Sequence, residues 1–284
     1  LPFYGSLGDL NRGARPTAVL IGTRCHLHTE YAIDVVDLGL PVWLEKPVSI
    51  STEQARRLEA AYAGRYDRVV VSFPLRVSPL AETISGRIAA GAVGSPEHIS
   101  ATNYVKYGTV YWEQGYRDFD ITGGLFLQKA THDFDVINTI IGRTPVSVAA
   151  FGSRLVYGGD MPNDLTCDVC DRKDTCPMSV YRLQQEGARP MSSGKGAKCV
   201  YASEIDIDDN HTVIINYEGG VTASYSQSFC APQRGGRRGG FFIGTAGTME
   251  LQYYGEFVET PEGEALVGNS RIDIMQRLAK PESS

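Results

Sequence analysis

A lysine and a histidine in this sequence have types and positions that suit proton chemistry on a hydroxyl group. Lys46 closely follows a short apolar segment, residues 42–44, that predicts a strand. Open α/β sheets bind ligands at the carboxyl ends of their strands, so a lysine there could steady a developing alkoxide. His132 titrates near neutrality and could accept the hydroxyl proton. Considered alone, each has a plainer explanation: Lys46 as a surface lysine and His132 as a hydrogen-bonded core histidine.

The residues around His132 predict one long helix, from about residue 124 to residue 141. Helical spacing places Gln128, His132 and Asp135 on adjacent turns of one face. Lys129 lies about one turn from His132, close enough to lower the pKa of the histidine or to bind a substrate. Lys129 is therefore a second candidate for a catalytic residue. Asp135 is expected to be a structural hydrogen-bond partner.

The elements that must position these side chains differ between the first third of the chain and the rest. The first third predicts strands at residues 18–23, 42–44 and 68–73, alternating with helices at residues 29–38, 52–63 and 79–91. A Ser or Thr at position 51 or 52 is expected to cap the second of these helices. Apolar strands that alternate with helices indicate a parallel sheet covered on both faces.

The remainder of the chain predicts a second kind of sheet. Its strands are expected at residues 98–107, 146–157, 213–217, 221–229, 241–244 and 248–254, and turn residues separate several of them. The predicted fold class is α/β: an incomplete Rossmann-type parallel-sheet domain over residues 1–93, followed by an α+β domain over residues 94–284. We expect the α+β domain to hold a large, mainly antiparallel open sheet with helices on one face. Residues 158–200, rich in Gly, Ser, Pro and Cys, are expected to form an insertion.

The charge and hydropathy of the chain argue against two classes of partner. The 284 residues carry a net charge of −6, whereas nucleic-acid binders normally have a basic balance. The basic run at residues 234–238 is expected to be a mobile hairpin tip rather than an RNA-binding tail. No run of about 18 apolar residues and no export signal occurs. The sequence therefore predicts a cytoplasmic protein with neither a nucleic-acid nor a membrane partner.

Four of the six cysteines are clustered in the sequence. They follow the pattern Cys-x₂-Cys-x₅-Cys, with a fourth Cys after a 22-residue spacer, at positions Cys167, Cys170, Cys176 and Cys199. Four thiolates would suit a structural zinc ion that staples a loop lacking its own core. An iron–sulfur cluster and the absence of any metal are the alternatives.

The motif Glu45-Lys46-Pro47 at the end of a predicted strand resembles the Glu-Lys-Pro signature of the Gfo/Idh/MocA family of NAD(P)-dependent oxidoreductases. Upstream, residues 18–23 followed by His28 resemble the strand, Thr-Pro turn and helix-starting His of that family. Here Arg24 stands where Pro is usual. Pro47 is predicted to follow a cis peptide bond, a tight-turn device that would aim Lys46.

The downstream part of the chain carries the same resemblance. Residues 116–118, the pair Gly123-Gly124 and the residues from Gln128 to Asp135 are similar to the Trp-Arg, Gly-Gly-Gly and Asp-x-x-x-His-x-x-Asp motifs of the family. Residues 243–248 match its recurrent Gly-Thr-x-Gly turn. Gln128 occupies the position of the family's Asp, so a charged relay through that position is lost.

The resemblance implies an NAD- or NADP-dependent dehydrogenase in which Lys46 polarises the substrate oxygen and His132 is the general acid/base. The expected cofactor-binding residues belong to the turns after the first two strands: Gly22, Thr23, Arg24, His28, Glu45 and Lys46. The expected substrate-binding residues are Tyr104, Arg117, Gln128 and His132, within or near an aromatic cluster that includes Tyr107, Tyr111, Trp112 and Tyr116.

The implied substrate is a sugar, a sugar acid, an inositol or a similar polyol, and the implied assembly is a homodimer or homotetramer. No Gly-x-Gly-x-x-Gly loop occurs before Ala18, so the sequence starts about two or three strands into the family's Rossmann domain. Two alternatives to a dehydrogenase remain open. One is a glycosidase of the same superfamily that oxidises transiently and recycles its NAD; the other is a non-catalytic sensor or degenerate fragment.

Overall fold

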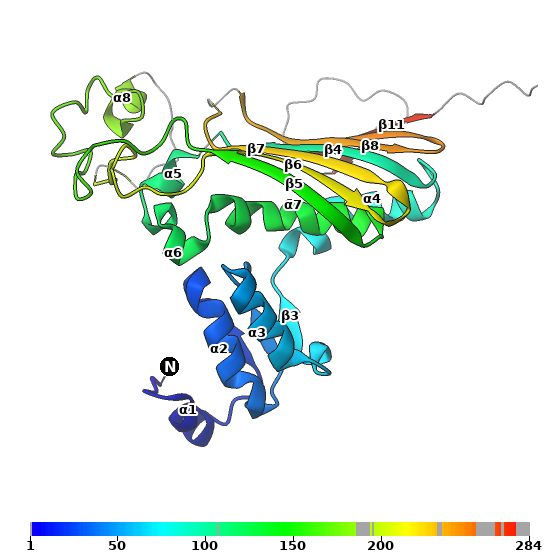
Figure 1. Ribbon diagram of the computed structural model, residues 1–284, viewed down its shortest axis with the longest axis horizontal. Helices are drawn as coiled ribbons and strands as arrows, with labels where there is room; N and C mark the ends of the chain where they lie inside the picture. The colour runs from blue at the N-terminus through cyan, green and yellow to red at the C-terminus, as the bar shows by residue number, and fades with distance from the viewer. Residues whose placement is uncertain are drawn as a thin grey trace, which may run out of the picture.

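The computed structural model describes residues 2–106, 108–185, 194, 196–231, 235–253, 265–267 and 270–276. Two sheets organise these residues (Figure 1). A three-stranded parallel sheet has the order β1-β2-β3, and an eight-stranded sheet has the order β10-β11-β9-β8-β4-β7-β6-β5. Both the Rossmann-like parallel sheet and the mainly antiparallel second sheet confirm the predicted fold class. The predicted boundary at residue 93 stays a prediction.

The first domain alternates strands and helices as its apolar pattern predicts. Its elements are α1 (Leu7–Ala14), β1 (Val19–Ile21), η1 (Cys25–Leu27), α2 (His28–Val35), η2 (Val36–Leu38), β2 (Val42–Leu44), α3 (Thr52–Tyr62), η3 (Tyr66–Arg68) and β3 (Val69–Val71). Ser51 is the N-cap of α3, because its hydroxyl accepts a hydrogen bond from the Gln54 amide at 3.1 Å. Such a cap stabilises a helix by about 1 kcal/mol.

Helices cover only one face of this small sheet among the described residues. The side chains of Ile21, Val42 and Leu44 are buried in a core with α2 and α3. On the opposite face Leu20 is 74% exposed and Trp43 is 47% exposed. The expectation of a sheet covered on both faces is therefore wrong for the residues that the structure describes.

The second domain is built on β4, which pairs in parallel with β7 and antiparallel with β8. Its strands are β4 (Pro96–Tyr104), β5 (Pro145–Ser153), β6 (Asn210–Tyr217), β7 (Thr222–Ser228), β8 (Arg237–Gly244), β9 (Gly247–Gln252), β10 (Ala265–Val267) and β11 (Ser270–Gln276). The structure places Arg237 and Arg238 in β8, so the expectation that the basic run at residues 234–238 forms a hairpin tip is wrong for these two arginines. Arg234, the other arginine of the run, lies outside the described residues.

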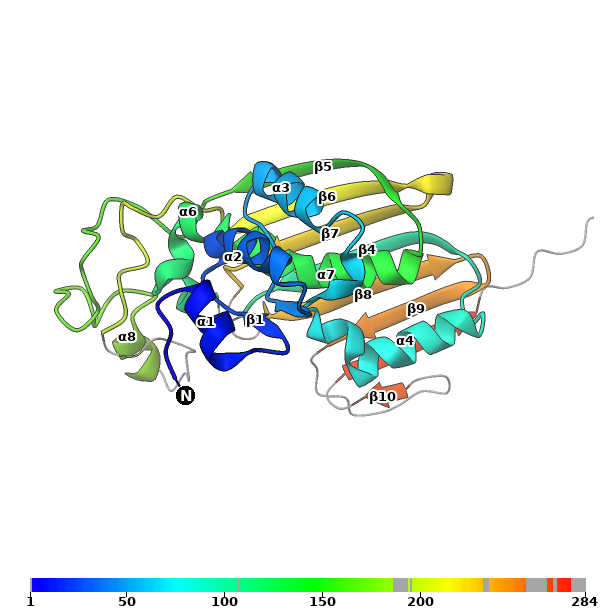
Figure 2. The ribbon, with the colours of Figure 1, turned by 90° about the horizontal axis from the view of Figure 1, so that it is seen from below.

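Two helices cover one face of the large sheet. These are α4 (Pro79–Ala89) and α7 (Leu125–Ile141), and α7 lies between the sheet and the first domain (Figures 1 and 2). Leu80 and Ile84 of α4 share a core with Ile137 of α7. Because α7 faces both parts of the molecule, its polar side chains can reach the strand ends of the first domain.

Short helices and an insertion at one end of the large sheet complete the fold. The short helices are η4 (Pro74–Val77), α5 (Thr109–Trp112), η5 (Gly115–Arg117), α6 (Phe119–Thr122), α8 (Val180–Gln185) and η6 (Glu218–Gly220). A separate apolar core joins Trp112 and Phe229 to Tyr157, Ile205 and Ile207 at the borders of the insertion. No helix in the described ranges is long and apolar enough to cross a membrane.

Candidate active site

Lys46 joins the two domains at the carboxyl end of β2. Its ammonium donates a hydrogen bond to the backbone carbonyl of Gln128 on α7, with an Nζ···O distance of 2.8 Å. The Lys46–Pro47 peptide bond is cis, as predicted. Burial lowers the pKa of Lys46 below its ordinary value, and the charge of Glu45 opposes part of that shift. The lysine is thus held in place at the meeting point of a strand end and a helix.

His28 fixes the two turns that surround Lys46. Its Nδ1 lies 2.7 Å from the Pro47 carbonyl oxygen, and its Nε2 lies 3.0 Å from the Thr23 carbonyl oxygen. The side chain is 2% exposed. Because both ring nitrogens contact backbone oxygens, the geometry favours a positioning role for His28 over a direct contact with a cofactor.

A cavity of about 160 Å³ opens beside Lys46. It is lined by residues of both domains, namely Thr23, Arg24, Cys25, His28, Glu45, Lys46, Tyr116, Ile121, Thr122 and Gln128. Five of the predicted cofactor-binding residues are in this set, and Gly22 directly precedes it in the chain. The sequence did not single out Cys25, Ile121 or Thr122; the only available signal was their position beside the Thr23 turn and the Gly123-Gly124 pair.

Gln128 contributes an unsatisfied polar atom to the cavity. Its side chain is 7% exposed, and its Oε1 accepts no hydrogen bond from the residues that the structure describes. A buried acceptor without a partner is costly in free energy, so such atoms often mark a ligand position. The predicted substrate-binding role of Gln128 is compatible with this placement.

His132 lies one helical turn beyond Gln128 on α7. Its ring meets the edge of Phe73 with centroids 6.0 Å apart, and its Nδ1 has no hydrogen-bond partner among the described residues. Burial, followed by the charge of Lys46, lowers the pKa of His132 to about 4. The imidazole is therefore neutral at neutral pH and can accept a proton.

Lys129 approaches the same region from the next position of α7. Its Nζ lies 4.3 Å from the centroid of the Tyr111 ring, a cation–π contact. Burial, followed by the charge of Lys46, lowers the pKa of Lys129 to about 8. Lys129 therefore lies close enough to Lys46 for the charge of Lys46 to disfavour its protonated form.

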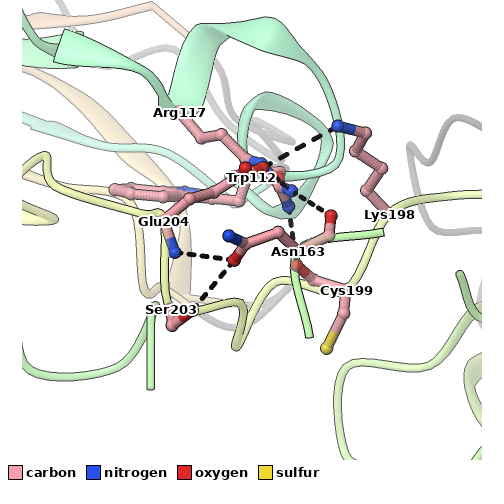
Figure 3. A network of polar contacts seen from close by, with 7 residues as sticks. All are labelled: Trp112, Arg117, Asn163, Lys198, Cys199, Ser203 and Glu204. Atoms are coloured by element: carbon pink, nitrogen blue, oxygen red, sulfur yellow. Dashed lines mark hydrogen bonds and ion pairs between the residues drawn. The ribbon is translucent and has the colours of Figure 1, made fainter. Parts of the chain in front are cut away.

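Arg117, predicted to bind substrate, occupies a different environment (Figure 3). Its guanidinium is 2% exposed and forms an ion pair with Glu204. It also donates hydrogen bonds to the carbonyl oxygens of Cys199 at 2.7 Å and Asn163 at 3.0 Å. Since it is absent from the cavity lining and ties the insertion to η5, the geometry favours a structural role over a substrate contact.

Tyr104 also points away from the cavity. Asn103 donates a hydrogen bond to Asp133 of α7 at 2.9 Å, so Asn103 faces the helix. Successive side chains of a strand face opposite sides of the sheet, which directs Tyr104 to the other face. Tyr107, a further member of the predicted aromatic cluster, lies outside the described residues.

Two aspartates of α7 have structural partners. Asp133 pairs with Arg238 of β8 at 2.9 Å and accepts a hydrogen bond from the Tyr225 hydroxyl at 2.6 Å. Asp135 pairs with Arg76, with an Nε···O distance of 3.0 Å, which agrees with its predicted structural role. The Asp133 network was not predicted, because no local pattern links β7 and β8 to this helix turn.

The four clustered cysteines line a second, smaller cavity of about 30 Å³ in the insertion. All four are free thiols. Burial raises the pKa of Cys167 to about 11 and also raises the pKa of Cys199, so both thiols are protonated at neutral pH. Among the described residues, no group of three or more His, Cys, Asp or Glu side chains is arranged to hold a metal ion. The structure gives the predicted zinc site no support.

The cavity lies where the strand ends of the first domain meet α7. The turns after β1 and β2 meet there, and ligands of open α/β sheets bind at this edge. Lys46 belongs to the turn after β2, the unpartnered Gln128 acceptor lines the cavity from α7, and His132 lies one helical turn beyond Gln128.

Comparison with known sequences settles the family. Residues 1–73 match the profile described as "Oxidoreductase family, NAD-binding Rossmann fold", and residues 82–250 match the "GFO/IDH/MocA C-terminal domain". The chain belongs to the Gfo/Idh/MocA family of NAD-binding oxidoreductases. This membership confirms the resemblance carried by Glu45-Lys46-Pro47 and the motifs around His132.

Individual relatives agree with the family assignment. YteT of Bacillus subtilis (strain 168) is 29% identical over 271 residues, which cover 87% of this chain and 63% of YteT. Inositol 2-dehydrogenase of Rhizobium meliloti (strain 1021) is 24% identical over 148 residues, which cover 49% of this chain and 41% of that enzyme. A levoglucosan dehydrogenase in complex with NADH and levoglucosan has the same fold, with a TM-score of 0.63 and 20% identity over 88% of this chain and 58% of that one. The chain thus spans less than two thirds of the length of these relatives.

Proposed function

We propose that this chain forms the substrate-binding part of an NAD(P)-dependent dehydrogenase that acts on a sugar, inositol or related polyol, or on the matching ketone. The observation that carries the proposal is the position of Lys46, whose ammonium is fixed against α7 at a cavity between the strand ends and the helix. The names of the relatives, an inositol dehydrogenase and a levoglucosan dehydrogenase, support a carbohydrate-like substrate.

NAD or NADP would supply the hydride-accepting ring, held by the turns at Thr23-Arg24 and Glu45-Lys46. Lys46 donates a hydrogen bond to the reacting hydroxyl and steadies the negative charge that develops on its oxygen. His132 is neutral and accepts the hydroxyl proton at one ring nitrogen as the carbon–hydrogen bond breaks. In the reverse direction the imidazolium returns that proton to the carbonyl oxygen.

A neutral base is what the reaction needs at His132. Burial, followed by the nearby charge of Lys46, disfavours the imidazolium, so the histidine is unprotonated throughout the neutral range. The same positive charge promotes release of the proton in the return step. Lys129 remains the second candidate for this proton transfer.

The experiment uses the full-length protein that contains this chain. Each of a panel of aldoses, sugar acids and inositols is incubated with NAD or NADP, and the absorbance of the reduced nicotinamide is followed. Stoichiometric NADH or NADPH formation with at least one compound is expected. Turnover of a glycoside without net reduction of the nicotinamide would instead identify an NAD-recycling glycosidase, and no turnover of any compound would favour a non-catalytic protein.

We also propose a cytoplasmic homodimer or homotetramer that associates through the outer face of the large sheet. That face exposes Phe151 of β5 at 81%, Ile214 of β6 at 58% and Phe241 of β8 at 36%. Free thiols are typical of a reducing compartment. Light scattering of the purified protein tests the assembly: a monomer would refute it, and a Phe151→Glu variant should dissociate a dimer formed through this face.

A further inference from the structure

Three cationic side chains gather at the candidate site without a carboxylate partner. Arg24 and Lys46 line the cavity, and Lys129 lies close enough to Lys46 for the two charges to interact. Within the described residues, no salt bridge involves any of the three. Glu45 is the one carboxylate in the cavity lining, and it forms no ion pair there. A chain with a net charge of −6 has therefore collected positive charge at one place.

Three other arginines are paired with carboxylates. Arg117 pairs with Glu204, Arg76 pairs with Asp135, and Arg238 pairs with Asp133. Taking a cation out of water without a partner costs free energy. The lowered pKa values of Lys46 and Lys129 reflect that cost. A ligand that supplies a negative charge would offset this cost, which explains why Lys46 and Lys129 have no carboxylate partner in the described part of the protein.

Two tyrosines join the cations of the two domains. The Arg24 guanidinium lies 5.9 Å from the Tyr116 ring, the Tyr116 and Tyr111 rings meet edge to face at 5.7 Å, and the Lys129 ammonium lies 4.3 Å from Tyr111. We call Arg24, Tyr116, Tyr111 and Lys129 the cationic rim. Cation–π contacts hold a positive charge in position without neutralising it, so both cations of the rim keep their capacity to bind an anion.

Gln128 supplies an independent sign of a ligand. It is 93% buried, lines the cavity, and has an Oε1 without a hydrogen-bond partner in the described part of the chain. An aspartate at this position, as the family motif has it, would add a negative charge beside Lys46 and would repel an anion. The neutral amide leaves the cavity positive and still offers an acceptor to a sugar hydroxyl.

We propose that the substrate is a sugar acid whose carboxylate binds between Lys129 and Arg24, while Lys46 contacts the reacting hydroxyl and Gln128 a second hydroxyl. The inference rests on the proposed dehydrogenase function and names its substrate class. Tyr116 and Tyr111 can pack their ring edges on the sugar C–H surface.

The test measures binding by calorimetry to the full-length protein, in the presence and absence of NADH. The probes are pairs that differ only at C6: D-glucuronate with D-glucose, and D-galacturonate with D-galactose; D-glucose 6-phosphate replaces the carboxylate by phosphate. We expect at least one uronate to bind 10-fold or more tightly than its neutral partner and than the phosphate. Tighter binding of the phosphate would move the assignment from sugar acids to sugar phosphates. Equal binding of every charged and neutral pair would overturn the inference.

Variants locate the charge that is responsible. Lys129→Gln and Arg24→Gln should each weaken uronate binding about 10-fold or more, because each removes one charge-assisted contact. Lys129→Arg should restore most of the affinity. Lys173→Gln is the matched control, since Lys173 also lies over a tyrosine ring, at 5.4 Å from Tyr181, but in the insertion; it should leave binding unchanged. Circular dichroism confirms that each variant is folded.

The outcomes separate this inference from the proposed function. Loss of NADH affinity rather than uronate affinity in Lys129→Gln would assign the cations to the cofactor and would sink the inference. NADH formation by the wild type from neutral sugars and from no uronate would sink the inference and leave a dehydrogenase of another substrate class. Tight, Lys129-dependent uronate binding without any nicotinamide reduction would keep the binding site and reject the dehydrogenase.

Discussion

The Arg117 network takes its cation out of water and neutralises it, whereas the cationic rim leaves a half-buried Lys129 and an exposed Arg24 without an ion pair among the described residues. Around Arg117, the Glu204 carboxylate and the backbone carbonyls of Cys199 and Asn163 accept hydrogen bonds from the guanidinium (Figure 3). Around Lys129 and Arg24 the described residues provide a tyrosine ring for each cation and no ion pair. Charge that is satisfied within the fold contributes to stability, and charge that is left unsatisfied is available to a ligand. Removing cations from the two regions should therefore have opposite effects on stability.

The largest effect is expected in the Arg117 network. Arg117→Met leaves Glu204 and the Cys199 and Asn163 carbonyls without their donor. Breaking a buried pair in this way costs about 3–5 kcal/mol. Urea unfolding of the variant and the wild type measures the difference; a loss below 1 kcal/mol would mean that Arg117 is not the structural tie inferred here.

A smaller effect concerns the pH dependence at His132. Its pKa is lowered to about 4, whereas an unfolded histidine titrates near 6.5. Between these values the unfolded chain binds a proton that the folded protein does not, so stability is complete above pH 6.5 and falls as the pH drops toward 4. His132→Asn should remove this dependence. Relative to the variant, the wild type should lose about 2 kcal/mol between pH 7 and pH 4, after a discount for partial exposure. Parallel curves for the two proteins would contradict the lowered pKa.

The opposite sign is expected at Lys129. Lys129→Met removes a half-buried cation that has no carboxylate partner but also loses the cation–π contact with Tyr111. The balance should raise the free energy of unfolding by about 1 kcal/mol at pH 7. Because the pKa of Lys129 is about 8 in the folded protein, the advantage of the variant should shrink as the pH rises from 8 toward 10.5. A variant less stable than the wild type would mean that the contact between Lys129 and Tyr111 stabilises the fold more than the unpaired charge destabilises it.

The smallest effect is expected for an exposed ion pair. Arg57 and Glu30 pair at 2.8 Å, but both are more than 40% exposed, at 48% and 42%. Arg57→Met should change stability by about 0.5 kcal/mol or less, because exposed pairs gain little over hydrated charges. Urea unfolding of Arg57→Met and Arg117→Met under the same conditions compares the two losses of unfolding free energy. A much larger loss in Arg117→Met would mean that burial of an ion pair, and not pairing alone, determines its contribution to stability.

Local patterns in the sequence were sufficient for the first domain and for α7. The apolar runs at β1 and β2 and the Ser51 cap predicted these elements, and the helix around His132 was found almost to the residue. The catalytic candidates Lys46 and His132 were predicted because the strand end and the helix face are both local features. That Lys46 and His132 lie in the same region of the fold was predicted from the family resemblance.

Long-range pairing could not be predicted from the sequence. Nothing local distinguishes Arg117 from Arg24, because Glu204 and Asn163, the partners of Arg117, lie 87 and 46 residues away. The glycines after Arg238 look like turn residues, yet a Cβ at Gly240 would lie 2.2 Å from the Ser100 carbonyl oxygen. The absence of a side chain at Gly240 lets β8 lie close to β4. In this position Arg238 of β8 pairs with Asp133 of α7.

The role of Lys46 is tested most directly by Lys46→Ala in the full-length protein, with Lys173→Ala as a surface control. The rate of NADH formation with the best substrate should fall about 10²–10⁴-fold, while the Kd for NADH, measured by fluorescence, should change less than about 3-fold. The control should match the wild type in both. Undiminished turnover in Lys46→Ala would contradict the proposed role of the lysine.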